Sequence, residues 1–161
     1  MKDRERFARY LGVFLLSVIL GSIAVLTGVK ARKRKLRIRI RWRKVGGLKN
    51  LEGVDGEVFA LAIGGILLYV GKVGENIEES IRRVMERKYE DPERIPRNVK
   101  VYVGKIVSRI RIDDEDLASL LVSILQPPWN LPEDGNYTGT VPVDVLNEGE
   151  LPPGFKPHIR L

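Results

Sequence analysis

The chain has 161 residues, a length that suits one domain with its own core and leaves no room for two once an apolar segment is set aside. It contains no cysteine, which excludes disulfides, thiolate metal sites and cysteine nucleophiles. The net charge of +7 arises in residues 30–44, which hold ten Lys and Arg and no acid, whereas residues 45–161 carry 14 basic and 19 acidic side chains.

The N-terminal part begins with a short charged segment, residues 1–10, followed by 19 uncharged residues, 11–29. A helix of that length covers about 28 Å, so we predict one transmembrane helix at 11–29. A cleaved signal peptide is the alternative, which we disfavour because the apolar run is long and ends in Lys30 and Arg32. The basic residues that follow the helix outnumber those before it, which predicts a single-pass cell-membrane protein with its N-terminus outside and its C-terminal domain in the cytoplasm.

Residues 30–44 form a basic juxtamembrane segment in which residues 36–43 alternate between apolar side chains and arginine. Alternation of this kind predicts a strand with Leu36, Ile38, Ile40 and Trp42 on one face. The other face then carries an arginine row, which we define as Arg37, Arg39, Arg41 and Arg43. Its nearest phosphates are anionic lipid head groups, and nucleic acid stays open as the other partner. The predicted binding residues are Lys33, Arg34, Lys35, Arg37, Arg39, Arg41, Arg43 and Lys44.

Residues 45–130 predict an α+β domain, a small antiparallel sheet flanked by helices. The sequence VFALAIGGILLYV at 58–70 indicates a β-hairpin around Gly64 and Gly65. An amphipathic helix at 76–89 follows, then a strand at 99–107 that the pattern allows to continue through residues 109–112. Four acids at 113–116 precede a helix at 117–125, and we interpret them as caps rather than metal ligands. Residues 131–161 are rich in proline and glycine, which predicts an extended coil that either wraps the domain or is mobile.

Several short motifs occur in a suggestive order. Val58-Phe59 lies in the first hairpin strand, Tyr69-Val70-Gly71 in the second, and LQPPWN at 125–130 follows the last helix. Together with Lys72 and Asn76, these motifs make residues 54–130 resemble the GIY-YIG nuclease domain. The resemblance implies cleavage of one DNA strand with a divalent metal such as Mg²⁺ or Mn²⁺, through two tyrosines, a helix arginine and a metal-binding glutamate.

The chain departs from that family pattern at three positions. Phe59 stands where the first tyrosine is expected, and Ala118 at the glutamate position. Ser80 stands at the arginine position if one residue is inserted after Lys72, and Glu79 stands there without an insertion. Replacement by Arg82, Arg83, Asp114 or Glu115 requires a shift of about one helical turn. The residual site predicted from the resemblance is Tyr69, Lys72 and Asn130, with no metal site and no cofactor unless the nuclease alternative holds, in which case the metal is Mg²⁺ or Mn²⁺.

The hairpin geometry bears on the residual site. A two-residue turn at Gly64-Gly65 predicts Phe59 and Tyr69 on opposite sheet faces. A three-residue loop with a bulge predicts them as direct neighbours, as the family site requires.

The sequence therefore predicts a membrane-anchored cytoplasmic binding or scaffolding module with a GIY-YIG-like fold and a degenerate, inactive nuclease site. A membrane-associated, metal-dependent DNA endonuclease is the first alternative, and a structural envelope protein is the second. A protein partner and the oligomeric state stay open.

Overall fold

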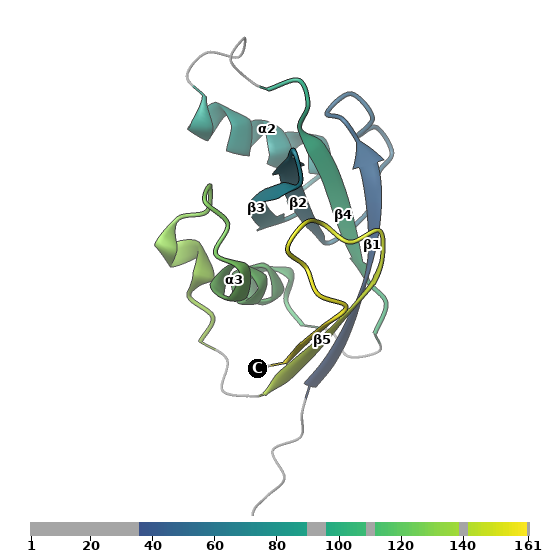
Figure 1. Cartoon of the computed structure of the whole chain (residues 1–161), viewed down its shortest axis with the longest axis vertical. Helices are drawn as coiled ribbons and strands as arrows, with labels where there is room; N and C mark the ends of the chain where they lie inside the picture. Colours follow the sequence, from purple (N-terminus) through teal and green to yellow (C-terminus); the bar gives the residue numbers. More distant parts are fainter. Residues whose placement is uncertain (1–35, 90–95, 109–111, 139–141, 161) are drawn as a thin grey trace, which may run out of the picture. The chain divides into compact units, whose positions relative to one another are not determined.

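The computed structural model describes residues 36–89, 96–108, 112–138 and 142–160, and the α+β prediction is confirmed for them (Figure 1). Their strands form one six-stranded sheet in the order β3-β2-β4-β1-β5-β6. The strands are β1 (Leu36–Gly46), β2 (Val58–Ile63), β3 (Ile66–Lys72), β4 (Lys100–Ile106), β5 (Val143–Gly149) and β6 (His158–Arg160). The helices are α2 (Ile77–Lys88), α3 (Asp114–Leu125) and the short 3-10 helix η2 (Pro132–Gly135).

Strand β1 lies inside the sheet, between β4 and β5. Its apolar residues Ile38, Ile40 and Trp42 are buried and the arginines between them are exposed, so the predicted alternation is confirmed. The pairing of β1 is antiparallel with β4 and parallel with β5. The sheet is therefore mixed and larger than the small antiparallel sheet predicted for residues 45–130.

The two longer helices cover opposite faces of the sheet. Helix α3 belongs to a hydrophobic cluster with the buried side of β1, whereas α2 packs on Phe59 and Leu61 of β2. Both helices begin at side-chain caps, because Asn76 Oδ1 accepts a hydrogen bond from the Glu79 amide at 2.8 Å and Asp113 Oδ1 accepts one from the Glu115 amide at 2.9 Å. Asp113 thus caps α3 as predicted, whereas Asp114, Glu115 and Asp116 lie in its first turn, because the helix begins three residues before the predicted residue 117.

The C-terminal residues differ from the extended coil predicted for 131–161, because β5 and β6 extend the sheet beyond β1. Trp42 provides the physical reason. Its Nε1 donates to Asn147 Oδ1 at 3.0 Å, and its ring contacts Phe155 edge-on with centroids 4.8 Å apart. Asn147 Nδ2 in turn donates to the Lys156 carbonyl at 2.8 Å, so this buried group connects β1 to both ends of the β5–β6 loop.

The β2–β3 hairpin combines features of the two predicted geometries. Ile63 pairs with Ile66 across a two-residue Gly64-Gly65 turn, and the register then shifts between Leu61 and Ala62. Leu68 is the extra residue of this bulge. Because a shift by one residue moves side chains to the other face, the side chains of β3 after Leu68 lie on the opposite face from the one that an unbroken register would give them.

Several predictions fall outside the described residues: the transmembrane helix at 11–29, the basic residues Lys33, Arg34 and Lys35, and the strand extension at 109–111. Within the part of the chain that the structure describes, no helix has the length and apolarity needed to cross a bilayer.

Candidate functional site

Tyr69 lies on the α2 side of the sheet, next to Phe59. The bulge at Leu68 pairs Tyr69 with Leu61 and Gly71 with Phe59, and the Phe59 and Tyr69 rings have centroids 5.6 Å apart. Gly71 makes this arrangement possible, since a Cβ there would lie 2.6 Å from Tyr69 Cε1 and 2.9 Å from its hydroxyl. The position of the Tyr69 ring therefore requires a residue without a side chain at position 71.

Burial raises the pKa of the Tyr69 phenol above its ordinary value of 10.0, an effect that the nearby Arg87 guanidinium opposes. Arg87 lies 5.8 Å from the centre of the Tyr69 ring. The phenol is therefore protonated at neutral pH and available as a hydrogen-bond donor rather than as a base.

Asn130 holds the outer edge of β3. Its Oδ1 accepts from the Val70 amide at 2.9 Å, and its Nδ2 donates to the Val70 carbonyl at 2.8 Å. The Trp129 amide adds a bond of 2.8 Å to the Leu68 carbonyl. Because these groups satisfy an edge strand that would otherwise be open, the role of Asn130 in this structure is to clamp the sheet edge.

Two hollows flank Tyr69. The hollow on the α2 side has a volume of about 290 Å³, and three of its lining residues are cationic. Ser80, Arg83 and Arg87 reach it together because they recur at helical spacing along one stripe of α2. Its other side includes Phe59, Tyr69 and Lys72. Arg87 is not among the site residues predicted from the sequence, although its helical spacing from Ser80 could have indicated it.

The hollow on the α3 side has a volume of about 230 Å³ and contains both Lys72 and Glu115 in its wall. Lys72 Nζ lies 2.5 Å from Glu115 Oε2, and this hydrogen bond raises the pKa of Lys72 above 10.5. Lys72 is thus a charged, partnered ammonium. Tyr69, Lys72 and Asn130 all line this hollow, together with Ala118.

The three positions at which the chain departs from the nuclease pattern have structural roles. Phe59 is 1% exposed and packs in the core. The Ser80 hydroxyl accepts from the Gly74 amide and donates to the Asn76 carbonyl, both at 2.8 Å. Ala118 is 8% exposed and belongs to the α3 cluster. Among the described residues, no group of three or more His, Asp or Glu is placed to hold a metal ion.

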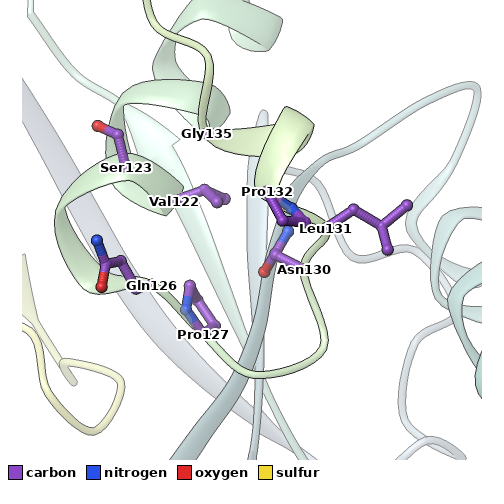
Figure 2. A pocket seen from close by; sticks show the side chains of 8 residues that line it. All are labelled: Val122, Ser123, Gln126, Pro127, Asn130, Leu131, Pro132 and Gly135. Atoms are coloured by element: carbon purple, nitrogen blue, oxygen red, sulfur yellow. The ribbon is translucent and has the colours of Figure 1, made fainter.

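A further hollow of about 400 Å³ lies between the end of α3 and η2 (Figure 2). It has no charged residue in its lining, and its one predicted site residue, Asn130, is already bonded to Val70. Gln126, which ends α3 in a left-handed conformation with φ of 45°, and Pro127 form one wall. We assign this hollow no chemistry.

The arginine row forms a second candidate site on the exposed face of β1. All four of its arginines are exposed, and Lys105 of β4 lies directly beside Arg41. Lys105 bonds to Asp55, which raises its pKa above 10.5. Lys44, also predicted to bind, is exposed, but strand alternation turns its side chain to the other face.

Two acids of β5 lie on the same face as the arginine row. Glu148 Oε1 is 3.0 Å from Arg39 Nε, and Asp144 Oδ2 is 4.0 Å from Arg37 Nε, with His158 Nε2 3.4 Å from Asp144 Oδ1. Arg41 and Arg43 form no ion pair within the described residues. These counterions were not predicted, because they lie in the segment predicted to be coil.

No family model matches the chain, and comparison with curated proteins and with solved structures finds no match either. The GIY-YIG resemblance therefore depends on the motifs alone and stays a prediction.

Proposed function

We propose that this chain is a membrane-tethered module on the cytoplasmic side that binds anionic lipid head groups through the arginine row. The observation that carries the proposal is the position of the row, on the exposed face of a strand whose other face is buried. Guanidinium groups suit this task because each offers five donors in a fork that matches phosphate oxygens.

The tether supports the choice of lipid over other phosphates. Residues 11–29 are apolar and uncharged, and only six residues separate them from Leu36. An extended segment of that size spans at most about 25 Å, so a helix anchored at 11–29 keeps the start of β1 near the bilayer surface. The ten basic residues of 30–44 favour the cytoplasmic side, where anionic lipids concentrate.

The charges on the row favour a weak, reversible association. Each basic residue near an anionic surface contributes about 1 kcal/mol. Arg41 and Arg43 are available directly, whereas Arg37 and Arg39 have acids nearby. Exposed ion pairs of that kind contribute only about 0–1 kcal/mol, so lipid phosphates can replace the carboxylates.

The domain that carries the row belongs, in this proposal, to the GIY-YIG-like class and lacks its nuclease activity. The hairpin, α2, β4 and α3 follow the expected chain order. The chain lacks three groups that the family chemistry uses at these positions. Phe59 has no phenolic hydroxyl, Ser80 has no guanidinium, and Ala118 has no carboxylate. Binding and scaffolding at the membrane then remain as its function.

A comparison of lipid with DNA tests this proposal. Residues 30–161 are mixed with phosphatidylcholine vesicles, with the same vesicles containing phosphatidylserine, and with a DNA duplex. We expect binding to the anionic vesicles that falls by about 1 kcal/mol for each arginine of the row changed to serine. Tight duplex binding without vesicle binding would contradict the proposal and favour nucleic acid.

A second candidate function, the metal-dependent endonuclease, is favoured by one observation: Arg83, Arg87 and Lys72 surround the same hollow as Tyr69. In this candidate, Glu115, which accepts a hydrogen bond from Lys72, would bind the metal. Incubating residues 45–161 with plasmid and Mg²⁺ or Mn²⁺ tests it. Nicking that disappears in Tyr69→Phe would establish this candidate in place of the inactive module.

A further inference from the structure

A hollow of about 350 Å³ lies on the face of the arginine row, near the start of β1. Guanidinium groups of the arginine row and apolar side chains line it together. Its lining residues are Arg37, Ile38, Arg39, Val107, Ser108 and Leu146.

The sheet register produces the apolar part of this hollow. Arg39 pairs with Leu146 on one side, and its carbonyl accepts a hydrogen bond of 2.9 Å from the Val107 amide on the other. Val107 is 36% exposed and Leu146 is partly exposed. One arginine of the row therefore stands between two accessible aliphatic side chains.

The two arginines keep donors available. The ion pair of Arg39 with Glu148 uses Nε, and the contact of Arg37 with Asp144 also involves Nε. Their side chains are 53% and 77% exposed, respectively. In the described part of the chain, the terminal nitrogens of both groups have no other partner, which suits a phosphate approaching from solvent.

We propose that this hollow binds one anionic phospholipid, with the phosphate on Arg37 and Arg39 and the glycerol and first acyl carbons on Val107 and Leu146. The inference rests on the proposed function, because the tether and the row bring the hollow to the bilayer. It adds a defined site to what is otherwise a diffuse electrostatic attraction. Charge complementarity selects this occupant, since a second copy of the chain would bring the same cationic face against itself.

Apolar contact makes a membrane lipid a better ligand than a free phosphate ester. Burying methylene groups is favourable, so even a few acyl carbons add to the phosphate contact. A soluble compound such as glycerol phosphate offers only the charged part.

The absence of cysteine allows a direct test with single labels. The full chain is placed in nanodiscs with an environment-sensitive fluorophore at Leu146→Cys, at Lys105→Cys beside Arg41, or at Glu133→Cys on η2 as a control. The anionic lipid carries a nitroxide quencher either on its head group or near the acyl carbonyl.

We expect the acyl nitroxide to quench most of the fluorescence at position 146, the head-group nitroxide to quench position 105, and neither to quench position 133. Arg37→Ser with Arg39→Ser should abolish quenching at 146, and excess glycerol phosphate should leave it largely intact. Release by glycerol phosphate would show a site for free phosphate and overturn the lipid assignment.

Two other results distinguish a defined lipid site in the hollow from general binding of lipid by the arginine row. Quenching at 105 without quenching at 146 would refute the lipid site and leave the proposed function standing. Absence of quenching at both positions in anionic nanodiscs would refute the proposed function itself.

Discussion

Glu148 is the acid whose removal should most clearly strengthen binding by the arginine row. Its Oε1 lies 3.0 Å from Arg39 Nε, and its backbone position is in register with Arg41. Glu148→Gln keeps the size of the side chain and removes one negative charge from the face that we expect to contact lipid. The side chain is 42% exposed, so the loss of the ion pair should cost at most about 1 kcal/mol of stability.

The magnitude follows from the same charge argument. If one basic residue near an anionic surface contributes about 1 kcal/mol, an acid beside it cancels about the same amount. Glu148→Gln should therefore raise the partition coefficient of residues 30–161 into phosphatidylserine-containing vesicles about fivefold. Sedimentation of vesicles with increasing lipid concentration measures this coefficient.

Glu133→Gln is the matched control, because it makes the same charge change on η2, which packs with α3 and not with the row. It should have a much smaller effect than Glu148→Gln. Equal gains in the two variants would show that only net charge matters, and no gain in Glu148→Gln would refute the assignment of the binding face.

Three further predictions concern stability and titration. Asn130→Ala should lower the free energy of unfolding by about 2 kcal/mol, measured by urea denaturation, because both polar groups of Val70 lose their partner; an unchanged midpoint would refute the clamp. Trp42→Phe should lower it by about 2–4 kcal/mol, since Asn147 Oδ1 is left buried without its donor; a loss below about 1 kcal/mol would contradict this role. Because burial raises the pKa of Tyr69, its stabilising contribution should be complete below pH 10.0 and be lost as the pH rises through the folded-state pKa. In an absorbance titration, one phenol should ionise at higher pH than the others in the unmodified chain, and this phenol should be absent in Tyr69→Phe. Identical titration curves above pH 10.0 apart from amplitude would refute this.

Local patterns predicted the parts of the fold that depend on local physics. Alternation in residues 36–43 specified which side of β1 is buried, and the four acids at 113–116 indicated the start of a helix, although α3 begins at Asp114 rather than at residue 117. The β5–β6 extension could not be predicted in this way. Strand β6 has only three residues, and what stabilises the extension is a contact between Trp42 and Asn147, which lie 105 residues apart.

The candidate sites were predictable to different degrees. The arginine row is visible in the sequence, whereas its counterions Asp144 and Glu148 come from β5 and become neighbours only through parallel pairing with β1. The position of Tyr69 depended on one extra residue, Leu68, because a bulge reverses the face of every later side chain. No property of Leu68 itself indicates a bulge.

The central claim is that the face of β1 binds anionic lipid, and a paired charge deletion tests it most directly. Arg41→Ser with Arg43→Ser removes two charges from the row, and Lys100→Ser with Lys156→Ser removes two exposed charges elsewhere. We expect the first pair to lower the partition of residues 30–161 into phosphatidylserine-containing vesicles by about 2 kcal/mol, about 30-fold, and the second pair to cause a much smaller loss. An equal loss in both pairs, or none in the first, would contradict it.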